Sequence, residues 1–172
     1  MAAEPPDLYA ASIFLLILEM ANNFTAIYLH LIFAAKFREA RITEAVEKHL
    51  YPFVSGVINN RKNTMVEIGG AADHMHILVR LHPTQTISDL VRDIKANSSK
   101  LLNETNILKR RFEWQRGFGA VSCSPGHVDE VRRYIANQKE HHRKLSFGEE
   151  FKSFWERNKI EYVEEFGFEE LH

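Results

Sequence analysis

The chain has 172 residues, of which 45% are hydrophobic and 26% charged, enough apolar material for one domain with its own core. A single cysteine excludes an internal disulfide and favours an intracellular protein. The net charge of -1 hides an uneven distribution, because residues 88–145 carry 12 basic against 7 acidic residues and residues 146–172 carry 3 against 8. The basic middle of the chain therefore suits an anionic partner better than the total charge suggests.

The N-terminal segment, residues 1–21, stands apart from the pattern that follows it. Its apolar run at residues 13–18 is too short to cross a bilayer, and the segment lacks the basic leader and cleavage site of a signal peptide. We therefore expect no membrane association. Two interpretations stay open: the segment is translated from upstream of a start at Met20, or it packs on the fold as an extra strand or helix.

A strand and a helix are predicted first. Residues 24–37 form a long aromatic and β-branched run, typical of a strand. Within it, we interpret His30 as a packed or hydrogen-bonded strand residue and not as a ligand. Thr43 is the expected N-cap of a helix that ends near residue 60, and Pro52 is expected to kink or split that helix.

Two strands and a second helix come next. A short strand is predicted at residues 65–68, with the glycines at residues 69–70 ending it, and a longer strand at residues 73–81. Thr86 or Ser88 is the expected N-cap of the second helix, because apolar residues recur after it at helical spacing. Lysines and arginines lie on the other side of this helix and, with Arg132 and Arg133 further along the chain, are candidates for phosphate contacts.

The last predicted strand spans residues 114–123, with bends at its glycines. A third helix is expected to begin near residues 127–129 and to run to about residue 145. Residues 146–172 form an acidic, aromatic tail with a helix expected at residues 148–157. We interpret the tail as a solvated appendage, and packing on a dimer or shielding of the basic surface stay open as alternatives.

The order of these elements predicts an α+β fold. Strand, helix, strand, strand, helix, strand is the βαββαβ plan of ferredoxin-like domains, an antiparallel sheet with helices on one face. The third helix follows as a C-terminal addition, and one face of the sheet is expected to stay free for a ligand. We assign residues 22–145 to this domain.

Two histidines in the strand at residues 73–81 suggest a metal site. Side chains on a strand alternate between faces, so His74 and His76 point the same way while Met75 points to the other face. Two neutral imidazoles supply part of a metal site and need a further ligand. Asp73 either orients one histidine or ends the preceding turn, and we favour the turn.

The third helix offers that ligand. Tyr134 and Gln138 are four residues apart and share one helical face, with His141 three residues further on. A Gln138 carbonyl oxygen beside two imidazoles makes a mixed nitrogen and oxygen set that suits Mg²⁺ or Mn²⁺. Tyr134 is then a candidate nucleophile. For His141 and His142 a role at the site and a solvated helix end are equally plausible.

These segments together resemble a known family. Residues 73–79 match the histidine-hydrophobe-histidine motif of the HUH nucleases, and residues 134–142 resemble the catalytic helix of the single-tyrosine transposases of small bacterial insertion sequences, the TnpA type, which include relatives associated with repeated palindromes. Residues 28–38 and 114–119 are similar to further segments of that family. The resemblance covers roughly residues 22–144.

The resemblance implies a function and its residues. Members cut and rejoin single-stranded DNA at hairpins, with a tyrosine that attacks a phosphate and leaves a 5′-phosphotyrosine bond and a free 3′-OH. Carried over by position, Tyr134 is the catalytic nucleophile, and His74, His76 and Gln138 bind Mg²⁺ or Mn²⁺. Members form homodimers, in which one subunit's tyrosine can meet the other subunit's histidines. A bacterial cytoplasmic, nucleoid-associated protein is therefore expected.

Three other functions stay open. The chain can be a domesticated HUH nickase that processes repeated hairpins without mobility. It can also be a nucleic-acid-binding module with a vestigial metal site. A zinc hydrolase would need a water-activating carboxylate near the histidine pair, for which the strands offer only Asp73 or Glu67.

Overall fold

The structure is a computed structural model that describes residues 24–38, 41–105, 107–142 and 147–161. The extra segment expected at residues 1–21 lies outside these residues. Within them, no helix is both long and apolar enough to span a membrane. The elements, in chain order, are β1 (Tyr28–Ala34), η1 (Lys36–Arg38), α2 (Glu44–Asn60), β2 (Thr64–Gly70), β3 (His74–Arg80), α3 (Ile87–Glu104), β4 (Gly119–Cys123), η2 (Pro125–His127), α4 (Val128–Ala136), α5 (Gln138–His141) and α6 (Phe147–Arg157).

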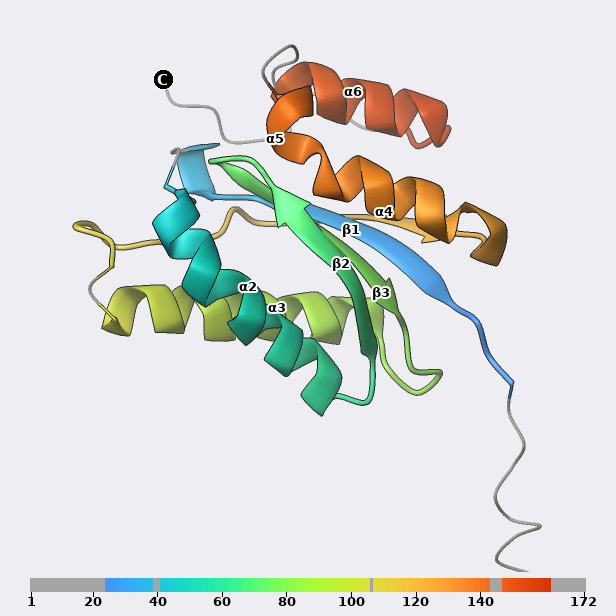
Figure 1. The fold of residues 1–172 in the computed structure, drawn as a ribbon, viewed down its shortest axis with the longest axis horizontal. Helices are drawn as coiled ribbons and strands as arrows, with labels where there is room; N and C mark the ends of the chain where they lie inside the picture. Colours follow the sequence, from blue (N-terminus) through green and yellow to red (C-terminus); the bar gives the residue numbers. More distant parts are fainter. Residues whose placement is uncertain (1–23, 39–40, 106, 143–146, 162–172) are drawn as a thin grey trace, which may run out of the picture.

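The four strands form one antiparallel sheet in the order β2-β3-β1-β4. This is the ferredoxin-like arrangement that the element order predicts. Helices α2 and α3 cover one face of the sheet (Figure 1). Alternate residues of the central strands, among them Leu31, Phe33 and Ile77, point into that layer and are fully buried. Threonine N-caps hold the starts of both helices: the Thr43 hydroxyl accepts from the Val46 amide and the Thr86 hydroxyl from the Asp89 amide.

The other face of the sheet is covered, not free as predicted. Helices α4 and α6 lie on the side opposite α2 and α3 (Figure 1). Phe151 and Trp155 of α6 pack on Ile32 and Ala34 of β1 in a second apolar cluster. The part of the tail that forms α6 is therefore not a solvated appendage. The apolar residues of α6 recur every three to four positions and form a stripe that packs on the sheet.

Several predicted boundaries were wrong. The third helix is not continuous to residue 145, because Asn137 leaves helical geometry (φ -96°, ψ 11°) and separates α4 from α5. The predicted strand at 114–123 contracts to β4, with Trp114 making only an isolated bridge to Ala35. The helix α2 accommodates Pro52 without splitting. β2 continues through Gly69 and Gly70, since both remain paired with β3.

Candidate active site

The two histidines of β3 point toward the layer of α4 and α6, as the alternation predicts. Both His74 and His76 are fully buried, and their ring centroids lie 5.1 Å apart. Their neighbours Met75 and Ile77 belong to the core on the opposite face. The strand therefore holds two imidazoles side by side in a site that is shielded from bulk water.

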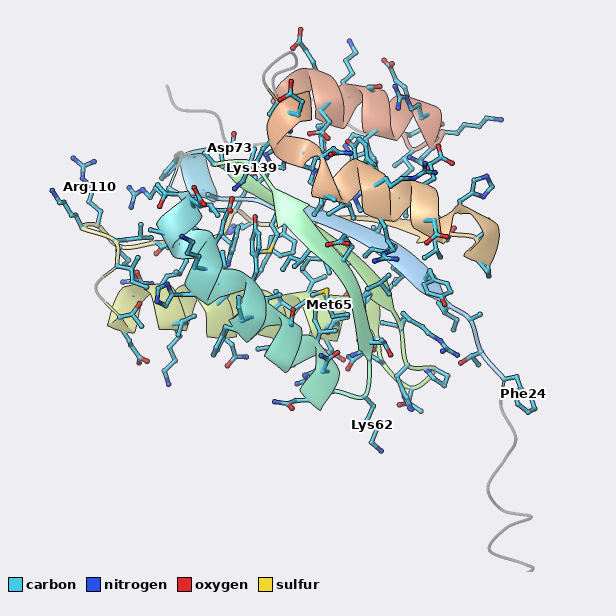
Figure 2. The ribbon with its side chains drawn as sticks, in the orientation of Figure 1. Phe24, Lys62, Met65, Asp73, Arg110 and Lys139 are labelled. Atoms are coloured by element: carbon cyan, nitrogen blue, oxygen red, sulfur yellow. The ribbon has the colours of Figure 1, made fainter. Side chains whose placement is uncertain are left out.

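Asp73 lies in the bend before β3 and also orients His74, so the turn role that we favoured is one of two. Its Oδ1 atom lies 2.7 Å from His74 Nδ1, and a carboxylate can only accept in this bond. The proton of the neutral ring is then on Nδ1, so the lone pair is on Nε2. Figure 2 labels Asp73 at the end of the sheet where β3 begins.

His30 of β1 holds the second imidazole. Its Nε2 atom lies 2.8 Å from His76 Nδ1, so His30 is the packed, hydrogen-bonded strand residue that we predicted. Burial lowers the pKa of His30 to about 3 and that of His74 to about 4, the latter despite the bond to Asp73. These two imidazoles are therefore neutral at physiological pH, the form in which histidine binds metals.

Tyr134 and Gln138 reach the histidine pair from above the sheet. The Tyr134 ring centroid lies 5.8 Å from that of His76 and 6.0 Å from that of His30. Gln138, which begins α5, is 1% exposed, and its Oε1 atom accepts no hydrogen bond from the described residues. The two residues thus converge on His74 and His76 within a single chain, although a helix break lies between them.

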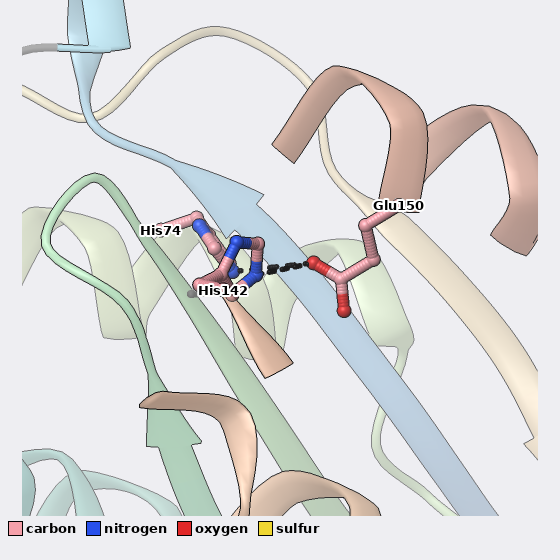
Figure 3. Close-up of side chains that lie close together, drawn as sticks. All are labelled: His74, His142 and Glu150. Atoms are coloured by element: carbon pink, nitrogen blue, oxygen red, sulfur yellow. Dashed lines mark hydrogen bonds and ion pairs between the residues drawn. The ribbon is translucent and has the colours of Figure 1, made fainter. Parts of the chain in front are cut away.

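A carboxylate that we did not predict occupies the centre of this group. Glu150 of α6 accepts hydrogen bonds on Oε1 from the Tyr134 hydroxyl and from Gln138 Nε2, the latter at 2.9 Å. Its Oε2 atom lies 2.6 Å from His142 Nε2 (Figure 3). The only sequence signal was indirect: Glu150 lies beside Phe151 and four residues before Phe154, on the apolar side of a predicted helix.

The ionisation of the site follows from these contacts. Burial by itself would raise the pKa of Glu150, but hydrogen bonds from His142 and Tyr134, together with the nearby His76 ring, hold it well below its usual range. Burial, together with the negative charge of Glu150, raises the pKa of Tyr134 well above its usual range. The phenol is therefore protonated in this state, and a nucleophilic role requires added positive charge nearby.

His142 belongs to the site, which answers one half of an open question. Its ring centroid lies 4.4 Å from that of His74, and His74, His142 and Glu150 offer ligand atoms that all lie within 4.8 Å of one another. The side chain of His141 lies outside the described residues.

Comparisons with known proteins identify the fold's relatives. The family model described as "Transposase IS200 like" matches residues 23–138, more than half of the chain. The chain belongs to the IS200-like transposase family. A candidate transposase from Deinococcus radiodurans R1 is similar in structure, with 21% identity and a TM-score of 0.56 over 68% of this chain and 94% of that one. A REP-associated tyrosine transposase bound to a REP hairpin has 16% identity and a TM-score of 0.56 over 71% of this chain and 72% of that one. No curated protein matched significantly.

The donor set of this family member fits a divalent cation. His74 presents an Nε2 lone pair, and the buried Gln138 Oε1 atom lacks a donor among the described residues. An amide oxygen buried without a partner is costly, and a cation would satisfy it. His76 can present Nε2 as well, provided that its Nδ1 donates to His30.

An open cavity lies beside Tyr134. It has a volume of about 820 Å³ and lies between β4, α4 and α6. Tyr134, Phe154 and Arg157 contribute to its walls, together with Ser122 and His127. The half-buried Tyr134 is therefore reached from this cavity.

Proposed function

We propose that this protein is a single-strand DNA transposase that cuts and rejoins DNA with Tyr134 as the nucleophile. The observation that carries the proposal is the convergence of Tyr134 on two buried, oriented imidazoles in one chain. The family supports the broad function, since its members are transposases. A tyrosine with a purely structural role would not be expected beside a buried carboxylate and two histidines. The Nδ1 atoms of both histidines already have hydrogen-bond partners, which are Asp73 and His30.

The reaction is a transfer of one phosphodiester. The Tyr134 phenol gives up its proton as its oxygen attacks the phosphorus, the bond to the 3′ oxygen breaks, and the 3′ oxygen takes up a proton and leaves as a hydroxyl. A 5′-phosphotyrosine link remains, which conserves the cleaved bond for rejoining without ATP. Reversal of the same step by a different 3′-OH joins new ends.

In this proposal His74, His76 and Gln138 hold a divalent cation, Mg²⁺ or Mn²⁺. When bound there, the cation would polarise the scissile phosphate and offset the charge that develops on it. Asp73 fixes the His74 ring with its lone pair on Nε2, and His30 fixes the His76 ring in the same way when His76 Nδ1 is the donor of their bond. The two imidazoles are thereby oriented before the substrate binds.

A hairpin in single-stranded DNA is the proposed substrate. The REP-associated relative is bound to a REP hairpin, which supports this class of ligand. Arg132 and Arg133 of α4 are exposed and remain candidates for phosphate contacts. Arg132 lies 3.7 Å from Glu67 and 3.6 Å from Asp129, so phosphate binding would have to displace these carboxylates.

The basic residues of α3 are weaker candidates than we expected. Arg92 is paired with Asp89 and Asp93 on its own helix. Lys95 donates to the carbonyl oxygens of Gln115 and Gly117, and burial lowers its pKa to about 8. Arg92 and Lys95 are thus engaged within the protein, so we assign the contacts with DNA phosphates chiefly to the arginines of α4.

A homodimer stays part of the proposal. The described chain brings its own Tyr134 to its own histidine pair, so one subunit holds a full set of the proposed residues. Exchange of α4 and α5 between subunits would preserve the same contacts in trans. Domestication as a nickase and loss of mobility are equally compatible with this chemistry.

The test is the covalent adduct. The full-length protein is incubated with Mn²⁺ and a labelled single strand from its own genomic borders that contains a hairpin and its flanks. We expect a protein–DNA adduct that survives denaturing electrophoresis, its loss in Tyr134→Phe with hairpin binding retained, and normal adduct in Tyr51→Phe, a control on α2 across the sheet. Hairpin binding that ignores Mn²⁺ and yields no adduct would instead identify a binding module.

A further inference from the structure

We propose that Glu150 of α6 is an additional ligand of the divalent cation, supplied by a part of the chain that follows the family match at residues 23–138. The inference rests on the proposed function, because it places a fourth donor beside His74, His76 and Gln138. It also gives the acidic tail a direct part in the site.

The geometry of the carboxylate is that of a ligand. Glu150 Oε2 lies 3.5 Å from His74 Nε2, and Oε1 lies 3.6 Å from His76 Nε2. Ligands of a small divalent cation sit ~2.1 Å from the ion, so neighbouring ligand atoms in an octahedral shell lie roughly 3 Å apart. The carboxylate and the two imidazoles already stand near that spacing, and small shifts would admit the ion between them.

A positive charge between His74 Nε2 and Glu150 Oε2 would stabilise this contact. Because the neutral His74 ring donates a hydrogen bond from Nδ1 to Asp73, its Nε2 lone pair faces the lone pairs of Glu150 Oε2. Two acceptors that face each other across such a gap are repulsive unless a cation or a proton lies between them. A divalent cation would turn this contact into two coordinate bonds.

The carboxylate of Glu150 is buried among histidines. Glu150 is 4% exposed, and the ion-pair partners of its carboxylate among the described residues are all histidines. Removing a carboxylate from water costs several kcal/mol unless a cation compensates it. Imidazole and amide groups bind metals as neutral donors, while carboxylate oxygen is the donor that Mg²⁺ and Mn²⁺ prefer.

The surroundings hold the carboxylate in place. His142 bonds Oε2, and Gln138 Nε2 bonds Oε1. The helix that carries Glu150 is docked through Phe151 and Trp155, and Gly119 of β4 leaves room for the Trp155 ring, since a Cβ there would lie 2.6 Å from it. The ligand is thus presented by a packed helix and not by a free tail.

The competing account is that Glu150 fills the place of the ion and excludes it. The two accounts predict opposite results for Mn²⁺ binding, measured on the full-length protein without DNA by calorimetric titration and by the electron paramagnetic resonance signal of free Mn²⁺. We expect Glu150→Gln to weaken Mn²⁺ binding at least tenfold, and Glu156→Gln, an exposed control on the same helix, to leave it unchanged. Unchanged or tighter binding in Glu150→Gln overturns the inference.

His76→Ala separates this inference from the proposed function. Loss of Mn²⁺ binding in His76→Ala with normal binding in Glu150→Gln would leave the proposed metal site standing and remove only Glu150 from it. Normal binding in both variants would overturn both. If Glu150→Gln fails to fold, judged by circular dichroism, Glu150→Asp decides, because it keeps the charge and withdraws the oxygens by one methylene: weaker binding supports the ligand role, and unchanged or tighter binding overturns it.

Discussion

Gly69 of β2 and Ile135 of α4 lie so close that a Cβ at position 69 would come within 2.5 Å of the Ile135 carbonyl oxygen. Gly69 is also the sheet partner of His76. The absence of a side chain on β2 therefore lets α4 rest directly on the sheet beside the histidine pair, and Tyr134 precedes Ile135 on that helix.

Gly69→Ala should displace α4, because the obstructing atom belongs to the backbone and cannot rotate away. We expect a loss of about 1–3 kcal/mol in the free energy of unfolding, measured by urea denaturation. Gly126→Ala is the matched control, since a Cβ at that position meets nothing within 4 Å. Equal stability of the two variants would show that α4 is not seated as described.

Asp73→Asn should impair metal binding without unfolding the protein. The amide can donate to His74 Nδ1 and so favours the wrong tautomer, with the ring proton on Nε2 where a lone pair is needed. We expect Mn²⁺ affinity to fall about 10–100-fold in a calorimetric titration. Asp129→Asn on α4, whose carboxylate is exposed, serves as the control. An unaltered Mn²⁺ affinity in Asp73→Asn would mean that the turn role of Asp73 is sufficient.

The stability of the metal-free protein should fall as the pH drops from 7 to 5. His30 and His74 have folded-state pKa values of about 3 and about 4, below the ordinary 6.5, so the unfolded chain binds protons that the folded chain rejects. Stability from these groups is present above pH 6.5 and is lost as the pH falls toward the folded values.

At pH 5 the loss should amount to roughly 2 kcal/mol for each histidine, since one pKa unit corresponds to about 1.4 kcal/mol. Urea denaturation at pH 7 and pH 5 measures it. His30→Asn, which removes one titrating ring, should show a smaller decrease. A stability that is flat over this range would contradict the buried, neutral imidazoles.

Trp155→Ala should release α6 from the sheet. The ring is buried, lies 4.6 Å from Phe151 between centroids, and packs on β1. We expect faster amide hydrogen exchange in α6 and a destabilisation of about 3 kcal/mol. Trp155→Phe should be much milder, because it keeps an aromatic ring and removes an indole N–H that has no acceptor among the described residues. Equal exchange rates in both variants would argue against docking through this ring.

Much of the site could be predicted from local spacing. The two-residue period of a strand places His74 and His76 on one face, and the hydrogen-bonding hydroxyls of Thr43 and Thr86 mark helix starts. Tyr134 and Gln138 are four residues apart, and both lie over the sheet face that carries the two histidines, although Asn137 interrupts the helix between them. These features depend on neighbours within one turn or one strand.

The sequence by itself determined which side chains share a face, because the periods of strands and helices are local properties of the backbone. Only the tertiary structure decided which faces meet. It brought Glu150 between the histidines, bonded His30 to His76, and covered the sheet face that seemed free. The physical reason is that the docking of α6 depends on the fit of a few rings against β1 and on the space left by Gly119, and no local pattern specifies such contacts.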